Sequence, residues 1–132
     1  MGIYLNPNSA NFQETLKRPI FVDKTMILKP LNRFIDQQNK YICVSRPRRF
    51  GKTIAGNIIS SYYSKGCDSR ELFSNLKFGR DETFFSKLNK YNVIQIDLNS
   101  EYRNCDSKDM LIKYLKQKLY CEFESQFSAI KF

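Results

Sequence analysis

Residues 41–63 constrain this chain more than any other stretch. Residues 41–44 form a short, wholly apolar run, which is typical of a parallel strand covered on both faces by helices. A basic turn ending in Gly-Lys-Thr follows, and the apolar residues after Thr53 recur with helical spacing. A strand, a phosphate-sized loop and a helix N-terminus in this order predict a binding site for a nucleoside triphosphate.

The loop departs from the usual G-x-x-x-x-G-K-[ST] pattern at one position, where Arg46 replaces the first glycine. Pro47 directs Arg46 toward an extended conformation and has no N–H to donate, which predicts an unusual loop entry. We predict that the nucleotide is bound by the second part of the loop and the helix start, namely Arg48, Arg49, Phe50, Gly51, Lys52 and Thr53.

Three of these residues have a defined task in such a site. Gly51 lets the backbone approach the phosphates without a Cβ, and Lys52 neutralises the β- and γ-phosphates. Thr53 offers its hydroxyl to Mg²⁺ and is the predicted metal ligand. The competing interpretation is a basic surface turn in front of an ordinary helix.

Hydrophobic periodicity and capping residues predict the remaining elements. A second strand is expected over residues 93–98, because the run is β-branched, and residues 99–106 are expected to form a polar loop. Helices are predicted at 12–16, at 25–28 behind Asp23, from Pro30 to 35, at 54–63 with Gly66 as C-cap, at 69–76 and 82–88 around a turn at 79–81, and from Ser107 or Asp106 to 124.

This order of elements predicts an α/β fold, a P-loop NTPase-type parallel sheet flanked by helices. A doubly wound sheet commonly has about five strands, and the sequence shows two good ones and one weak one, so we expect the sheet to be incomplete. No linker or repeat marks a boundary, which predicts one domain over residues 1–132. Residues 1–40 would form a helical lead-in, and residues 41–132 would hold the strand–loop–helix unit, the short helices, the second strand and the last helix.

The amino-acid composition limits the kinds of binding site and binding partner that this chain can have. The chain has 22 Lys and Arg against 13 Asp and Glu, and this net charge of +9 favours an anionic partner such as a nucleotide, a nucleic acid or an acidic protein. It has no His and its four cysteines stand singly, which excludes a zinc site or a His-based triad and predicts reduced thiols. Without a signal-peptide pattern or a long apolar run, the expected protein is cytoplasmic and makes no membrane contact.

Four segments are collinear over nearly the whole chain: N-F-Q-E at 11–14, F-V-D-K-T at 21–25, S-R-P-R-R-F-G-K-T at 45–53 and Y-N-V-I-Q-I-D at 91–97. Together they resemble the opening of the bacterial AAA-ATPase-like family. The phosphate loop S-R-P-R-R-F-G-K-[ST] is that family's own variant, so the replaced glycine becomes part of the resemblance. The resemblance implies a domain that binds ATP and Mg²⁺ through a Walker A loop, often followed in longer members by a restriction-endonuclease-like nuclease domain.

The resemblance also implies that this chain is the N-terminal part of such an ATPase. Longer members continue to an apolar strand ending in Asp-Glu, the Walker B carboxylates, and we find no such strand before Phe132. Asp97 is the one strand-end carboxylate and hence the candidate catalytic residue, but it has no acidic neighbour, and a capping or edge hydrogen bond is the preferred interpretation. Asp23 and Lys24 resemble the segment that in related ATPases lies near the adenine and ribose of the nucleotide. The alternative is that Asp23 is a plain helix N-cap.

Two other functions stay open. A basic, non-enzymatic module would bind nucleic acid through its net charge, with a steep salt dependence that ignores Lys52→Ala. A truncated gene product without independent activity would aggregate through unpaired strand edges.

Overall fold

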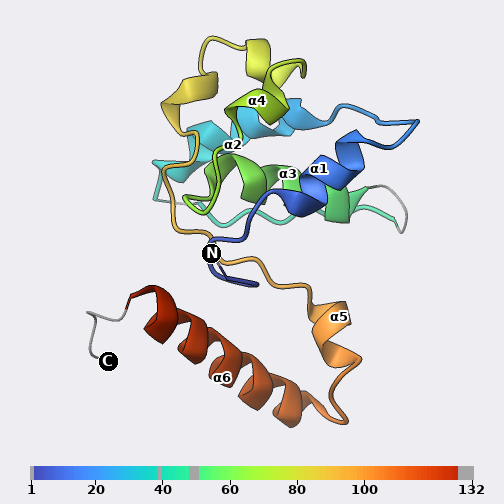
Figure 1. Cartoon of the computed structure of the whole chain (residues 1–132), viewed down its shortest axis with the longest axis vertical. Helices are drawn as coiled ribbons and strands as arrows, with labels where there is room; N and C mark the ends of the chain where they lie inside the picture. The colour runs from blue at the N-terminus through green and yellow to red at the C-terminus, as the bar shows by residue number, and fades with distance from the viewer. Residues whose placement is uncertain (1, 39, 48–50, 128–132) are drawn as a thin grey trace.

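The structure is a computed structural model that describes residues 2–38, 40–47 and 51–127, and its regular structure is helical (Figure 1). The helices are α1 (Ala10–Leu16), η1 (Thr25–Ile27), α2 (Leu28–Ile35), α3 (Lys52–Tyr63), α4 (Arg70–Phe73), η2 (Phe78–Arg80), η3 (Phe84–Ser86), α5 (Leu98–Tyr102) and α6 (Lys108–Gln126), where η marks a 3₁₀-helix. Within the described ranges, no helix combines the length and the apolar character needed to cross a membrane.

The helices fall into two parts. Figure 1 shows α1 to α4 gathered in one body, with α5 and α6 to one side of it and the N-terminal segment between the two parts. The Glu122 carboxylate on α6 accepts hydrogen bonds from the N–H groups of Ile3, Tyr4 and Leu5 at 2.7, 3.0 and 2.8 Å. The side chain of Gln126 donates to the carbonyl of Leu5 at 2.9 Å. The N-terminal segment therefore fastens α6 to the rest of the chain.

The core is an aromatic cluster around the C-terminal half of α3. Tyr62 is fully buried, and its ring centroid lies 5.9, 5.4 and 5.7 Å from those of Phe73, Phe78 and Phe84. Phe12 of α1 completes the cluster at 5.0 Å from Phe73. Tilted and edge-on pairs at such distances add to the hydrophobic gain of burial. The short helices after α3 thus fold back to bring their aromatic side chains to it.

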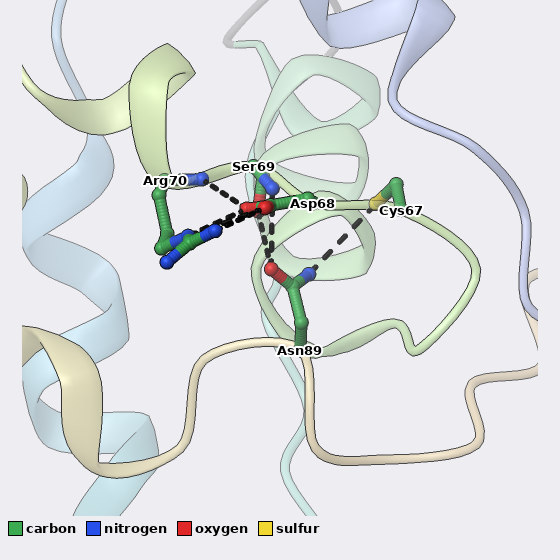
Figure 2. A network of polar contacts seen from close by, with 5 residues as sticks. All are labelled: Cys67, Asp68, Ser69, Arg70 and Asn89. Carbon is green, nitrogen blue, oxygen red and sulfur yellow. Dashed lines mark hydrogen bonds and ion pairs between the residues drawn. The ribbon is translucent and has the colours of Figure 1, made fainter.

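The side-chain amide of Asn89 forms hydrogen bonds that hold the end of α3 and the segment after it together (Figure 2). Its Oδ1 accepts from the N–H and the hydroxyl of Ser69 at 3.1 and 3.2 Å. Its Nδ2 donates to the carbonyls of Ser61 and Ser64 at 3.1 and 2.8 Å and contacts Sγ of Cys67 at 3.8 Å. Asn89 has a φ of 53°, in the left-handed region where Asn is enriched. One side chain therefore joins the end of α3, the start of α4 and the turn after η3.

The predicted α/β fold with a parallel sheet is wrong. The described part of the chain contains no strand, and its β pairing is limited to two isolated bridges, Leu5 with Ile94 (antiparallel) and Ser64 with Tyr91 (parallel). Residues 41–44 were predicted to be a covered strand, yet all four are exposed, with Tyr41 97% accessible. An apolar run becomes a strand only if another segment pairs with its backbone, and no described segment does so here.

The second predicted strand, residues 93–98, is wrong for a different reason. The Asn6 N–H donates to the Val93 carbonyl at 2.7 Å and the Gln95 N–H donates to the Tyr4 carbonyl at 2.9 Å, so the pairing is confined to the N-terminal segment. Directly afterwards Asp97 caps α5, and Leu98 is already helical. A local cap thus overrides the β-branched composition of the run.

The helix predictions were more accurate. Ser107 caps α6 as predicted, because its Oγ accepts from the Met110 N–H at 3.3 Å. The predicted C-cap of α3 at Gly66 is wrong, since the helix ends at Ser64, which has an extended backbone. Gly66 allows a close approach of two backbone segments instead, because a Cβ there would clash with the carbonyl oxygen of Asn6. The predicted turn at 79–81 overlaps η2, which is a 3₁₀-helix.

Candidate nucleotide-binding site

The start of α3 is formed by the Gly-Lys-Thr sequence. Gly51 is the residue before the helix and has a φ of 77°, a left-handed conformation that favours glycine. The Ala55 N–H donates to the Gly51 carbonyl at 2.9 Å, and Gly51 has no side chain with which to cap the helix. The N–H groups of residues 52–54 are therefore left without an acceptor inside the helix, and the helix dipole favours an anion beside them.

Two ammonium groups flank this helix start. The exposed Lys52 side chain folds back over the loop, where its Nζ donates to the Arg46 carbonyl at 2.9 Å. Lys24 reaches Gly51 from the segment before η1, because a Cβ built on Gly51 would lie 2.6 Å from Lys24 Nζ. A side chain at position 51 would displace that ammonium group. Two cations beside free N–H groups at a helix N-terminus suit a phosphate ligand.

One cavity beside the helix start, which we call the acidic cavity, has a volume of about 1060 Å³. Lys52, Thr53 and Asp97 line it, together with two further carboxylates, Glu14 and Glu101. The described residues include no group of three or more Cys, Asp or Glu that could hold a metal ion. Mg²⁺ usually takes one or two protein oxygens and completes its shell with phosphates and water, and the Thr53 hydroxyl can supply one such oxygen.

Asp97 lies in this cavity, but its carboxylate is already engaged. Its Oδ1 accepts from the N–H groups of Asn99 and Ser100 at 3.1 and 3.2 Å, and its Oδ2 accepts from the Ser100 hydroxyl at 3.1 Å. The carboxylate is thus the N-cap of α5. The capping role preferred for Asp97 from the sequence is present, at the start of a helix and not at the edge of a sheet.

A second cavity, which we call the basic cavity, has a volume of about 740 Å³. It is lined by residues 51–54 at the start of α3 and by Asn99, Tyr102 and Arg103 of the α5 region. These three residues share one helix face because they are spaced i, i+3 and i+4. The sequence prediction missed them because it placed residues 99–106 in a polar loop. The available signal was Asp97, which could have been recognised as the start of a short helix.

The predicted binding residues are only partly within the described ranges. Gly51, Lys52 and Thr53 lie together at the wall of the basic cavity, whereas Arg48, Arg49 and Phe50 lie outside the described residues. Their role in binding a nucleotide stays a prediction.

Asp23 and Lys24 are neighbours with different surroundings. Asp23 Oδ1 accepts from the Thr25 N–H at 2.9 Å, and its Oδ2 accepts from the Lys77 N–H at 2.8 Å. Burial raises the pKa of the Asp23 carboxyl, but the hydrogen bonds from Thr25 and Lys77 outweigh it and the pKa is lowered. Asp23 thus anchors the start of η1, while the ammonium group of Lys24 lies beside Gly51.

Comparison with known proteins identifies the family of this chain. A family model described as predicted AAA-ATPase matches residues 10–131. The chain belongs to this family. The resemblance of the sequence to the AAA-ATPase-like family is thus confirmed at the level of the family. The matched residues include Lys24, the start of α3 and all of α5. Neither a curated protein nor a solved structure matches the chain significantly.

Proposed function

We propose that this AAA-ATPase-like chain binds ATP with Mg²⁺ through a Walker A phosphate loop at residues 45–53. The observation that carries the proposal is the start of α3, where left-handed Gly51 leads into a helix without a side-chain N-cap and the ammonium groups of Lys24 and Lys52 lie nearby. The family description as a predicted ATPase supports ATP as the ligand.

In the proposed complex, the N–H groups of residues 52–54 donate to phosphate oxygens. Lys52 exchanges its hydrogen bond to the neutral Arg46 carbonyl for a hydrogen bond to a phosphate oxygen, in which both partners are charged. The Thr53 hydroxyl is the protein ligand of Mg²⁺, and the ion, when bound, neutralises phosphate charge.

The proposal covers binding and not hydrolysis. Asp97, the one carboxylate considered for catalysis, is the N-cap of α5 and accepts three hydrogen bonds there. We further propose that the chain is the N-terminal part of a longer ATPase whose remaining carboxylates would complete the hydrolytic site. A nuclease domain in that longer protein is an expectation from the family resemblance.

Titration with ATP, with and without Mg²⁺, tests this proposal. We expect Lys52→Ala to weaken ATP binding at least about tenfold, because a hydrogen bond to a charged group contributes about 1.5–3 kcal/mol. Lys65→Ala is the matched control, since Lys65 is an exposed lysine just beyond the opposite end of α3. Equal ATP affinity for wild type and Lys52→Ala would refute the proposal.

The same variants test the nucleic-acid alternative. A basic module would bind DNA or RNA with an affinity that falls steeply with salt concentration and is the same for Lys52→Ala and Lys65→Ala. That result, together with no binding of ATP, would favour the alternative over the phosphate site.

A further inference from the structure

The two cavities at the start of α3 differ in charge. Both are lined by Lys52, Thr53 and Asn99, so a ligand held at the helix start can extend into either one. Among its described lining residues, the acidic cavity carries three carboxylates against two cations: Glu14, Asp97 and Glu101 against Arg18 and Lys52. The described lining of the basic cavity carries two cations, Lys52 and Arg103, and no carboxylate.

This difference in charge determines which of the two cavities a chain of phosphates enters. Unlike charges a few ångströms apart near a protein surface attract strongly and like charges repel by as much, so a phosphate chain is favoured on the basic side. Thr53, the proposed ligand of Mg²⁺, lines both cavities, so the ion can stay beside the phosphates when they extend to the basic side.

We propose that the phosphate chain of the bound nucleotide extends into the basic cavity and that Arg103 of the α5 region binds it as a second cation. This inference rests on the proposed nucleotide binding. A guanidinium group can present two parallel N–H donors to one phosphate, which gives a contact that a lysine cannot reproduce. Asp97 then acts as a positioning residue, because its cap starts the helix that carries Arg103 to the cavity.

Arg103 also has a purely structural role to be distinguished from this one. It is the C-cap of α5, and a cation at a helix C-terminus is favoured by the helix dipole. A capping arginine affects the stability of α5, whereas a phosphate-binding arginine affects affinity according to the number of phosphates. The two roles therefore predict different measurements.

The experiment titrates the full chain with tripolyphosphate, ATP, ADP and AMP. We expect Arg103→Gln to weaken binding of tripolyphosphate and ATP about tenfold, with a smaller effect on AMP, and Arg103→Lys to restore only part of the loss. Arg33→Gln is the matched control, because it removes an exposed arginine of α2 that lines neither cavity. Thermal unfolding of each variant shows whether α5 and the body stay folded.

The outcomes separate this inference from the function it rests on. If Lys52→Ala loses ATP while Arg103→Gln binds all four ligands as Arg33→Gln does, the role of Arg103 is refuted and the proposed function stands. If Arg103→Gln lowers the melting temperature but weakens AMP and tripolyphosphate equally, Arg103 is only a cap. If wild type binds neither ATP nor tripolyphosphate, the proposed function itself is refuted.

Discussion

The two ends of α3 differ in role: one end is packed in the core, and the other is the proposed binding end. At the C-terminal end, Tyr62 and Tyr63 are buried, and their hydroxyls donate to the Phe84 carbonyl and to Asn32 Oδ1, each at 2.6 Å. At the N-terminal end, Lys52 and Thr53 are exposed and line two cavities. Packing at one end holds the helix in place, so the other end can keep charge and free N–H groups for a ligand. Stability and binding should therefore respond to different mutations along α3.

The largest expected change in stability comes from emptying the aromatic cluster. Phe73→Ala should lower the free energy of unfolding by about 3–5 kcal/mol, because Phe73 is fully buried and its removal leaves a cavity. Phe85→Ala, at a ring that is 64% exposed, should cost no more than about 1 kcal/mol. Urea denaturation of both variants measures the difference, and similar losses would show that the cluster is not the stabilising core.

Removing one hydroxyl at the buried end should have a smaller effect. Tyr62→Phe leaves the buried Phe84 carbonyl without its donor, which should cost about 1–3 kcal/mol. Tyr41→Phe removes the same atom from a residue that is 97% exposed and should change stability by less than about 0.5 kcal/mol. If the two variants were equally stable, the buried hydroxyl would contribute nothing to the packed end.

Asp23, which holds the start of η1, should make a pH-dependent contribution to stability. Asp23→Ala removes the acceptor for the N–H groups of Thr25 and Lys77 and should cost about 1 kcal/mol at neutral pH. Because the pKa of Asp23 is lowered from its ordinary value of 3.8, its stabilisation is complete above that value and is lost as the pH falls below it. The stability difference from wild type should therefore shrink in acid, whereas Asp106→Ala, at an exposed residue, should show a smaller difference throughout.

The smallest expected change in stability is at the binding end. Lys52→Ala should shift the free energy of unfolding by less than about 0.5 kcal/mol, because the side chain is exposed and its one described hydrogen bond is to the exposed loop. Thermal unfolding of the ligand-free variant measures this shift. A loss above about 1 kcal/mol would mean that the loop is part of the packed structure, and the contrast between the two ends would not hold.

The parts of the fold that the sequence could predict are those set by near neighbours. The cap of α6 links Ser107 to Met110, and the start of α3 depends on Gly51, so both are readable from a few adjacent residues. Strand formation depends on distant partners, and nothing near residues 41–44 indicates that no described segment pairs with them. The pairing of Val93 with Asn6 joins segments far apart in the chain and could not be seen in either one alone.

In the candidate site, too, the sequence could predict the residues that are contiguous with the motif but not those that come from a distant segment. The Gly-Lys-Thr sequence identified the start of α3, because the motif and the helix are contiguous. Arg103 was not identified, since it reaches the basic cavity only through the turn that Asp97 imposes before α5. A residue that reaches the site from a separate short helix cannot be recognised from the sequence pattern of the Gly-Lys-Thr motif.

The contact between Glu122 and the N-terminal segment also sets an order of events during synthesis. Residues 3–5 leave the ribosome long before Glu122, so their N–H groups must remain hydrated until the carboxylate is made. Closing so long a loop is slow compared with forming a local helix. The hydrogen bonds from Asn6 to Val93 and from Gln95 to Tyr4 can form earlier, because they need the chain only as far as residue 95. One of the first segments to be synthesised is therefore among the last to reach its final position.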